Sequence, residues 1–246
     1  MKEFIKRIVP RPLRTRIGNL FASSCGTHLR ISYSQEGEDL LLERLFDGKK
    51  SGFYVDVGAH HPRRFSNTFR FYKLGWNGIN IEPNPDALKL FQRTRKRDIN
   101  VGLGVADTQN NLTYFMFNEP ALNSFDRSLS EERQSTRYQI IGTKSIPVRR
   151  LSDILEDFLP SEVHIDFMSI DVEGYDFQVL KSNDWARFRP TYVLVESAGF
   201  DLIEPGNEPI HTFLQQQHYK LFAKTLNTLF YVDQATDVVR NRKQAS

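Results

Sequence analysis

Three short turns contain the residues of this sequence whose types and positions could do chemistry. They read DVGAHHP at 56–62, EPN at 82–84 and DVEG at 171–174. Each follows an apolar run that is typical of a buried strand. In a sheet built from alternating strands and helices, ligands bind beyond the carboxyl ends of the strands. We therefore expect the acidic side chains of the three turns to meet at one ligand site.

The first two turns favour a cofactor that contains adenosine. Glu82 lies 26 residues after Asp56, and a carboxylate at that distance can accept both ribose hydroxyls. The three-glycine fingerprint of dinucleotide sites is absent, and bulky His60, His61 and Pro62 stand where a pyrophosphate needs bare backbone N–H groups. S-adenosylmethionine carries an ammonium and a sulfonium, which a negative Asp56 attracts. A nicotinamide dinucleotide bound by a degenerate glycine loop remains the alternative.

Apolar periodicity predicts the elements that position these turns. Short apolar runs alternate with helical segments from Tyr33 onward, which predicts an α/β fold with a mostly parallel sheet and helices on both faces. The last two strands are so close in sequence that they must pair antiparallel. The expected strands cover 53–57, 78–82, 99–105, 111–117, 143–149, 165–172, 192–196, 219–225 and 228–232.

Capping residues predict where the helices begin. Ser34, Ser66 and Ser152 are expected to cap helices. Asn84 followed by Pro85 predicts a further helix start, because proline is well suited to the first helical position. Two more helices are expected from about 175 and near 209–218.

The chain resembles the FkbM-type methyltransferases, which are S-adenosylmethionine-dependent enzymes with the seven-stranded class I methyltransferase fold. The resemblance covers residues 33–233 and rests on motifs that occur in the family's order. These motifs are YSQEGED at 33–39, VDVGAH at 55–60, NIEPN at 80–84 and IDVEG at 170–174. The resemblance implies a Rossmann-like sheet that ends in a C-terminal antiparallel hairpin.

The residues and the resemblance together assign roles to individual side chains. The expected cofactor-binding residues are Gln35, Asp56, Gly58, Ala59, Glu82 and Pro83. Asp171 is the expected base or substrate-orienting residue, with Glu173 and His60 as further catalytic candidates. His60 stands where the family usually has asparagine. Ser169 stands where the family often has lysine, so a lysine-assisted reaction is disfavoured.

The resemblance also implies the kind of substrate. We expect an O-methyltransferase that acts on a hydroxyl of a sugar in a cell-surface glycan or of a secondary metabolite. The polar stretch 118–138 lacks periodicity and is expected to be a loop or lid, in which Asn123 and Ser124 are candidates for a substrate cover. A nicotinamide-dependent oxidoreductase and a non-catalytic Rossmann-like binding protein remain the alternative functions.

Composition excludes several classes of protein. The chain has 246 residues, of which 39% are hydrophobic and 26% charged, as in a globular domain with one core. Its single cysteine, Cys25, permits no internal disulfide, and no His and carboxylate spacing is typical of a metal site. The net charge of +3 disfavours a nucleic-acid partner. No apolar run approaches the ~18 residues of a bilayer span, so we expect a cytoplasmic protein.

Residues 1–30 are interpreted as a basic appendage to a methyltransferase domain at 31–246. Seven basic residues of the appendage face one acidic residue, Glu3, and apolar residues at 4–9 recur at helical spacing. Two prolines then interrupt any helix. An interfacial helix at the inner face of the membrane and a solvated arm both remain open.

The membrane interpretation predicts that the protein co-sediments with anionic vesicles through residues 1–20. Deletion of this segment should reduce the sedimented fraction. Added salt should reduce it for the full chain, because the attraction between basic side chains and anionic headgroups is screened. Equal sedimentation of the two proteins would leave the solvated arm as the interpretation.

Overall fold

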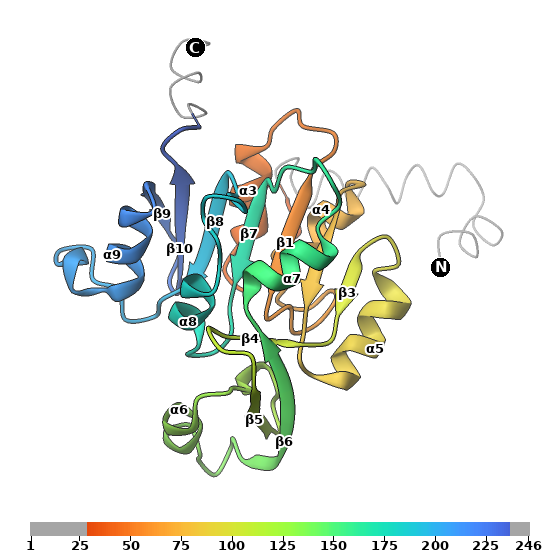
Figure 1. Cartoon of the computed structure of the whole chain (residues 1–246), viewed down its shortest axis with the longest axis vertical. Coiled ribbons are helices and arrows are strands. Elements are labelled where there is room, and N and C mark those ends of the chain that lie inside the picture. Colours follow the sequence, from red (N-terminus) through yellow and green to blue (C-terminus); the bar gives the residue numbers. More distant parts are fainter. Residues whose placement is uncertain (1–28, 237–246) are drawn as a thin grey trace. The chain divides into compact units, whose positions relative to one another are not determined.

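The computed structural model describes residues 29–236, and a seven-stranded sheet forms its centre (Figure 1). The strands are β1 Phe53–Val57, β2 Asn77–Ile81, β3 Ile99–Val101, β7 Phe167–Ile170, β8 Tyr192–Glu196, β9 Tyr219–Lys224 and β10 Thr228–Asp233. Their order is β3-β2-β1-β7-β8-β10-β9. β10 runs antiparallel to both of its neighbours, whereas the other pairings are parallel. The expected mostly parallel sheet with its C-terminal antiparallel hairpin is confirmed.

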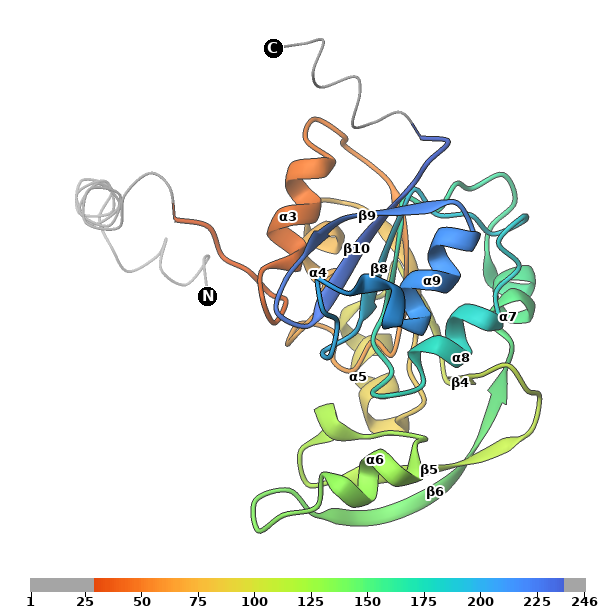
Figure 2. The ribbon, with the colours of Figure 1, turned by 90° about the vertical axis from the view of Figure 1, so that its left-hand side faces the viewer.

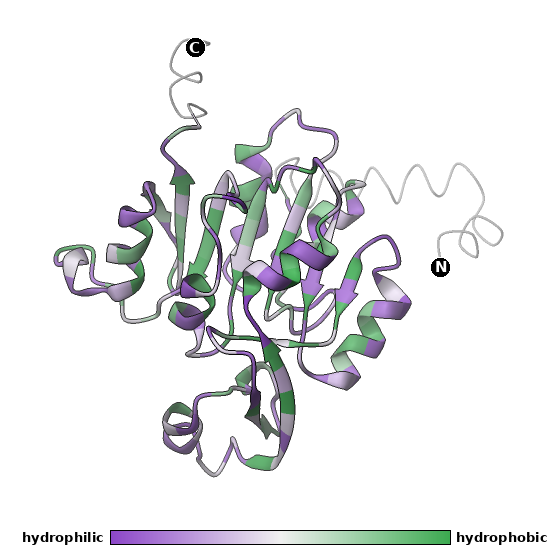
Figure 3. Cartoon of the chain, viewed as in Figure 1, coloured by the Kyte–Doolittle hydropathy of each residue, from purple (hydrophilic) through white to green (hydrophobic). Residues whose placement is uncertain are grey.

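Helices cover both faces of this sheet, as expected. One layer consists of α7 (Leu151–Phe158), α8 (Asp176–Lys181) and α9 (Pro209–Gln216), and the other contains α3 (Glu38–Leu45) and α4 (Phe69–Lys73). Successive side chains of a strand point to opposite faces, so Val55 of β1 packs with the first layer and Tyr54 with the second. Figure 2 shows the two layers on opposite sides of the sheet. Figure 3 shows that apolar residues are concentrated in the strands between them.

Two predicted helix starts rest on local capping. The side chain of Asn84 accepts the backbone N–H of Asp86, and α5 (Pro85–Thr94) begins at the proline, as predicted. The hydroxyl of Ser66 accepts the backbone N–H of Phe69 at 3.0 Å, although Thr68 occupies the cap position of α4. In both helices, the hydrogen bond at the start joins residues only two or three positions apart in the sequence.

The expected cap at Ser152 is wrong, and the one at Ser34 is only partly confirmed, because α3 begins later than expected. α3 begins after Gly37, which has a φ of 91°. The hydroxyl of Ser34 accepts the backbone N–H of Asp39 at 3.3 Å and donates to the carboxylate of Asp39 at 3.0 Å. Ser152 lies inside α7, and the first backbone N–H of that helix bonds to the hydroxyl of Ser182. A tertiary partner therefore replaces the predicted local cap of α7, whereas the contact of Ser34 with α3 is local.

A second sheet adjoins the carboxyl ends of the parallel strands (Figures 1 and 2). It consists of β4 (Gly104–Val105), β5 (Asn111–Phe117) and β6 (Ile140–Arg149), with β6 in the middle. The single strand expected at 99–105 is wrong, because β3 pairs with β2 and β4 pairs with β6. A Cβ on Gly104 would lie 2.6 Å from the ring of Phe125, so this close crossing needs glycine.

The stretch 118–138 is only partly the loop that its sequence predicts. It contains the short helices η1 (Pro120–Leu122) and α6 (Arg127–Glu132). The carboxylate of Asp126 caps α6 by accepting the backbone N–H of Leu129 at 2.9 Å. Helices of this length are too short to produce a recognisable apolar period.

The described chain from Tyr33 onward forms one unit. Within residues 29–236, no helix has the length and apolar character that a membrane span requires. The predicted membrane contact through residues 1–20 lies outside the described residues, as does nearly all of the predicted appendage. The domain boundary expected at residue 31 therefore stays a prediction.

Candidate active site

The carboxyl ends of β1, β2 and β7 open into one cavity of about 870 Å³, a volume that includes the part open to solvent. The three acidic turns meet there, and Asp56, Glu82 and Asp171 all line the cavity. The second sheet and the segment that follows β5 contribute Tyr114 and Phe125. A cavity beyond the carboxyl ends of parallel strands is where α/β sheets bind their ligands.

Gly58 permits the close packing of the strand ends. Its backbone N–H donates to the carbonyl of Ile81, and the N–H of Asp171 donates to the carbonyl of Val57, both at 3.0 Å. Gly58 has a φ of 78°, and a Cβ at this position would lie 1.8 Å from the carbonyl oxygen of Asp171. Only glycine fits both the conformation and the space.

Glu82 ties two of the turns together. One oxygen of its carboxylate accepts the backbone N–H of His60 and the other accepts that of Asn84, each at 2.7 Å. Burial raises the pKa of Glu82 to about 7, although both hydrogen bonds oppose the shift. Each carboxylate oxygen has two lone pairs, so Glu82 retains acceptor capacity for ribose hydroxyls.

Asp56 is a buried carboxylate with one side-chain donor. The hydroxyl of Thr68 donates to its Oδ2 at 2.7 Å. Burial raises the pKa of Asp56 to about 6, while the Thr68 hydrogen bond and the positive charge of Arg95 oppose the shift. Asp56 is therefore mostly ionised at neutral pH and attracts a cationic ligand group.

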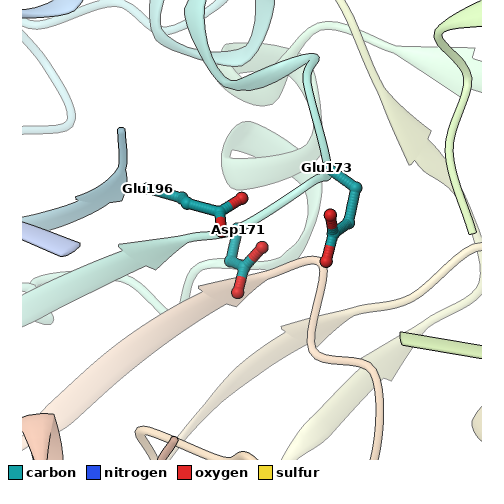
Figure 4. A group of neighbouring side chains, drawn as sticks. All are labelled: Asp171, Glu173 and Glu196. Carbon is teal, nitrogen blue, oxygen red and sulfur yellow. The ribbon is translucent and has the colours of Figure 1, made fainter. Parts of the chain in front are cut away.

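Three carboxylates meet at the ends of β7 and β8 (Figure 4). Oxygens of Asp171, Glu173 and Glu196 lie within 4.8 Å of one another. Burial raises the pKa of all three, that of Glu196 to about 8, and the neighbouring carboxylates raise the pKa of Asp171 further. Shared protons or one divalent cation would relieve this repulsion. The sequence-based expectation that the protein has no metal site stays a prediction.

A fourth acid holds the turn that carries two of these carboxylates. The side chain of Asp176 accepts two backbone N–H groups of the turn, at 3.2 and 3.1 Å. Glu173 has a φ of 54° and pairs with Arg133 at 2.6 Å. Asp176, and not Asp171, therefore holds the backbone of this turn, and α8 begins after Tyr175 without a side-chain cap. The Oδ1 of Asp171 is buried and has no hydrogen-bond partner among the described residues.

His60 presents a neutral imidazole to the cavity. Its backbone has a φ of 52°, and its ring stacks on Phe65 with 6.2 Å between the ring centres. Burial lowers the pKa of His60 to about 4. Its Nε2 is buried and lacks a hydrogen-bond partner within residues 29–236. This nitrogen is therefore available to a ligand.

The other expected cofactor residues line the same cavity. They are Gln35, Gly58, Ala59 and Pro83. Gln35 reaches the cavity from the loop before α3, because that helix begins only at Glu38 and not upstream as the capping pattern predicts.

Sequence reasoning missed Tyr114, Phe125 and Glu196. The rings of Tyr114 and Phe125 lie 4.8 Å apart beside the cavity, and in the sequence they look like ordinary core residues. Glu196 is an acidic residue at the end of an apolar strand. The same pattern identified Asp56, Glu82 and Asp171 and could have identified Glu196.

These residues fit S-adenosylmethionine. Apolar side chains of Ile81, Leu103 and Val105 line the cavity near Glu82 and offer a surface for an adenine ring. The carboxylate of Glu82 can accept hydrogen bonds from ribose hydroxyls, and a negatively charged Asp56 would attract a cationic cofactor. The cavity therefore contains an apolar surface, an acceptor for ribose hydroxyls and a negative charge, which together match this cofactor.

The sequence matches a family model described as the methyltransferase FkbM domain over residues 56–221, which is more than half of the chain. The chain belongs to the FkbM methyltransferase family. It is therefore a methyltransferase, and S-adenosylmethionine is its cofactor. The nicotinamide alternative is set aside.

Similar solved structures are also methyltransferases. The METTL16 methyltransferase domain is 12% identical, with a TM-score of 0.43 and coverage of 79% of this chain and 64% of that domain. A TehB-like protein from Corynebacterium glutamicum is 10% identical, with a TM-score of 0.41 and coverage of 91% and 97%. A Burkholderia thailandensis 1,6-didemethyltoxoflavin-N1-methyltransferase, solved with S-adenosylhomocysteine, is 13% identical, with a TM-score of 0.39 and coverage of 89% and 85%. No curated protein matches the sequence.

Replacement of Glu82 by glutamine should weaken binding of S-adenosylhomocysteine by about 1.5–3 kcal/mol, because a charged acceptor of hydrogen bonds is lost. Wild-type affinity should also fall as the pH falls through about 7, since Glu82 then takes up a proton and loses its charge. Calorimetry over a pH series measures both effects. Glu156→Gln is the matched control, because this glutamate is exposed and pairs with Arg187. Unchanged affinity in folded Glu82→Gln would remove Glu82 from ribose binding.

Proposed function

We propose that this methyltransferase transfers a methyl group to a hydroxyl oxygen of a sugar in a cell-surface glycan or of a secondary metabolite. The observation that carries the proposal is that Asp171 lines the cavity and that its buried Oδ1 has no hydrogen-bond partner in the described part of the chain. A hydroxyl must lose its proton as it is methylated, so an O-methyltransferase needs a proton acceptor at this place.

When bound, S-adenosylmethionine supplies an activated methyl group on a sulfonium that leaves as a neutral thioether. Asp171 accepts the proton of the acceptor hydroxyl. Its raised pKa makes the ionised carboxylate a stronger base than an exposed aspartate. The adjacent Glu196 has an oxygen within 4.8 Å of an oxygen of Asp171 and provides a second carboxylate for the proton.

The cofactor-binding residues act by alignment. Asp56 binds the ammonium of the methionine part, and Glu82 binds the ribose hydroxyls. Holding the two reactants in line accounts for a large part of catalysis in a displacement reaction. Gly58 and Ala59 bring the backbone of the β1 turn close to the cofactor.

His60 and Glu173 are the other candidates for the proton acceptor. The neutral ring of His60 has a buried nitrogen without a hydrogen-bond partner among the described residues, and its low pKa keeps it unprotonated at neutral pH. Glu173 is held by Arg133 at 2.6 Å, which weakens it as a base. Asp171 is therefore placed first, His60 second and Glu173 third.

The acceptor side of the cavity supports a polar, hydroxyl-rich substrate. Amide side chains of Asn67 and Asn123 line it together with Tyr114. Asn123 also accepts the backbone N–H of Phe117 at 2.8 Å, so its side chain is held in place. Amide groups both donate and accept hydrogen bonds, as sugar hydroxyls require. We propose a small-molecule or glycan acceptor and no nucleic-acid partner.

Replacement of Asp171 by asparagine should lower turnover by about two to four orders of magnitude with little change in cofactor affinity, because a proton acceptor acts in the transition state. Single-turnover methyl transfer and calorimetry measure the two quantities. Asp157→Asn, at an exposed position paired with Arg149, controls for the loss of a carboxylate. Near-normal turnover would move the search to His60 and then Glu173. A parallel loss of affinity and turnover would assign Asp171 to cofactor binding.

The acceptor is tested by mass spectrometry of glycans, lipids and small metabolites from cells with and without the gene. The proposed function predicts a methyl-sized mass difference in a hydroxylated molecule. Methylation at nitrogen or carbon only would contradict the proposed hydroxyl acceptor and leave the family assignment intact.

A further inference from the structure

A fully buried arginine lies behind the cofactor side of the cavity. Arg95 follows α5, and its Nε donates to the carboxylate of Asp98 at 2.7 Å. One terminal nitrogen donates to the carbonyl of Pro62 at 3.1 Å, and the other donates to Tyr54 at 2.8 Å and Thr68 at 3.0 Å. An uncompensated charge in this position would be costly, so each contact matters.

The contact between Arg95 and Thr68 sets the direction of the next hydrogen bond. A guanidinium has donors only, so the hydroxyl oxygen of Thr68 must act as acceptor toward Arg95. The hydroxyl proton of Thr68 is then directed to Oδ2 of Asp56, 2.7 Å away. Arg95 is in this way connected through one hydroxyl to a carboxylate of the cavity.

The same arginine also holds the first turn. The carbonyl of Pro62 ends the segment 58–62, and His60 in that segment donates its backbone N–H to Glu82. Arg95 is thus linked to both acids that face the cofactor, to Asp56 through Thr68 and to Glu82 through the turn.

We propose that Arg95 and Thr68 form a positioning relay that keeps Asp56 ionised and oriented toward the ammonium of the cofactor. This inference rests on the proposed role of Asp56 in binding that ammonium. Neither relay residue lines the cavity. Both are positioning residues that act through Asp56.

The charges around Asp56 make the relay necessary. Asp98 after α5 raises the pKa of Asp56, and the charge of Asp56 in turn raises the pKa of Glu82 at the end of β2 and of Asp171 after β7. Burial and the charge of Asp98 favour the protonated form of Asp56. Two groups among the described residues lower the pKa of Asp56. Thr68 donates a hydrogen bond to its carboxylate, and Arg95 contributes a positive charge.

The experiment compares two ligands across pH. S-adenosylhomocysteine has an ammonium, whereas 5′-methylthioadenosine has the same adenosine and lacks the amino acid. Protonation of Glu82 should weaken both ligands equally, because both carry the same ribose. The ratio of the two affinities is therefore independent of Glu82. In the wild type this ratio should fall as the pH falls through about 6, where Asp56 is protonated.

Thr68→Val keeps the shape of the side chain and removes its hydroxyl. The midpoint, which is the pH at which the affinity ratio has fallen halfway, should then rise by about one unit, because the charged form of Asp56 loses a hydrogen bond. Thr68→Ser should restore the wild-type midpoint. Thr68→Ala repeats the test without the branched side chain. Thr191→Val is the control, because it removes another buried threonine hydroxyl, which bonds to His164 at the opposite end of the strands.

The outcomes separate the relay from the proposed function. A ratio without a pH step in the wild type, or a midpoint unmoved in folded Thr68→Val or Thr68→Ala, would overturn the relay. A wild type that binds neither ligand would instead count against the cofactor site. A shift in Thr191→Val equal to that in Thr68→Val would reduce Thr68 to a general packing role and likewise overturn the relay.

Discussion

The burial of carboxylates at one edge of the sheet is the constraint on which the rest of the site depends. A buried carboxylate is costly unless hydrogen bonds or a cation stabilise its charged form. Backbone N–H groups bond to Glu82 and Asp176, a hydroxyl bonds to Asp56, and Arg133 pairs with Glu173. The negative charge that remains favours a cationic ligand. Binding of such a ligand to the folded state stabilises the fold as well.

The second sheet turns an open edge into an enclosed site. The hydroxyl of Ser124 donates to the carbonyl of Glu173 at 2.6 Å, and the side chain of Leu129 occupies the space that a Cβ of Gly174 would need. Arg133 adds its ion pair from the same connection between β5 and β6. The wall on the acceptor side is therefore attached to the turn that holds the proposed base. A change in this connection would alter the position of the base as well as the shape of the cavity.

The core and the cofactor site share residues behind β1. Arg95 lies over the ring of Tyr72, 4.7 Å from its centre, and bonds to Tyr54, whose ring belongs to the core layer of α3 and α4. Packing of this layer thus holds a charge that acts on Asp56. Residues that contact no ligand can in this way affect ligand binding through the position of one guanidinium.

The sequence by itself determined the strands at 53–57 and 192–196, the start of α5 at Asn84, and the acids that follow three strands. These features depend on periodicity and capping within a few residues, so they can be recognised without knowledge of the fold. The parallel-sheet rule then placed the acids at one edge, although the family motifs were needed to choose a methyltransferase.

Only the tertiary structure decided which of these residues became neighbours. It divided 99–105 between two sheets, replaced the expected cap at Ser152 with the hydroxyl of Ser182, and brought Glu196 beside Asp171. It also placed Arg95 behind Asp56, although a lone arginine after a helix is usually solvated. Strand pairing and the neutralisation of buried charge depend on partners far away in the sequence, and no local pattern specifies those partners.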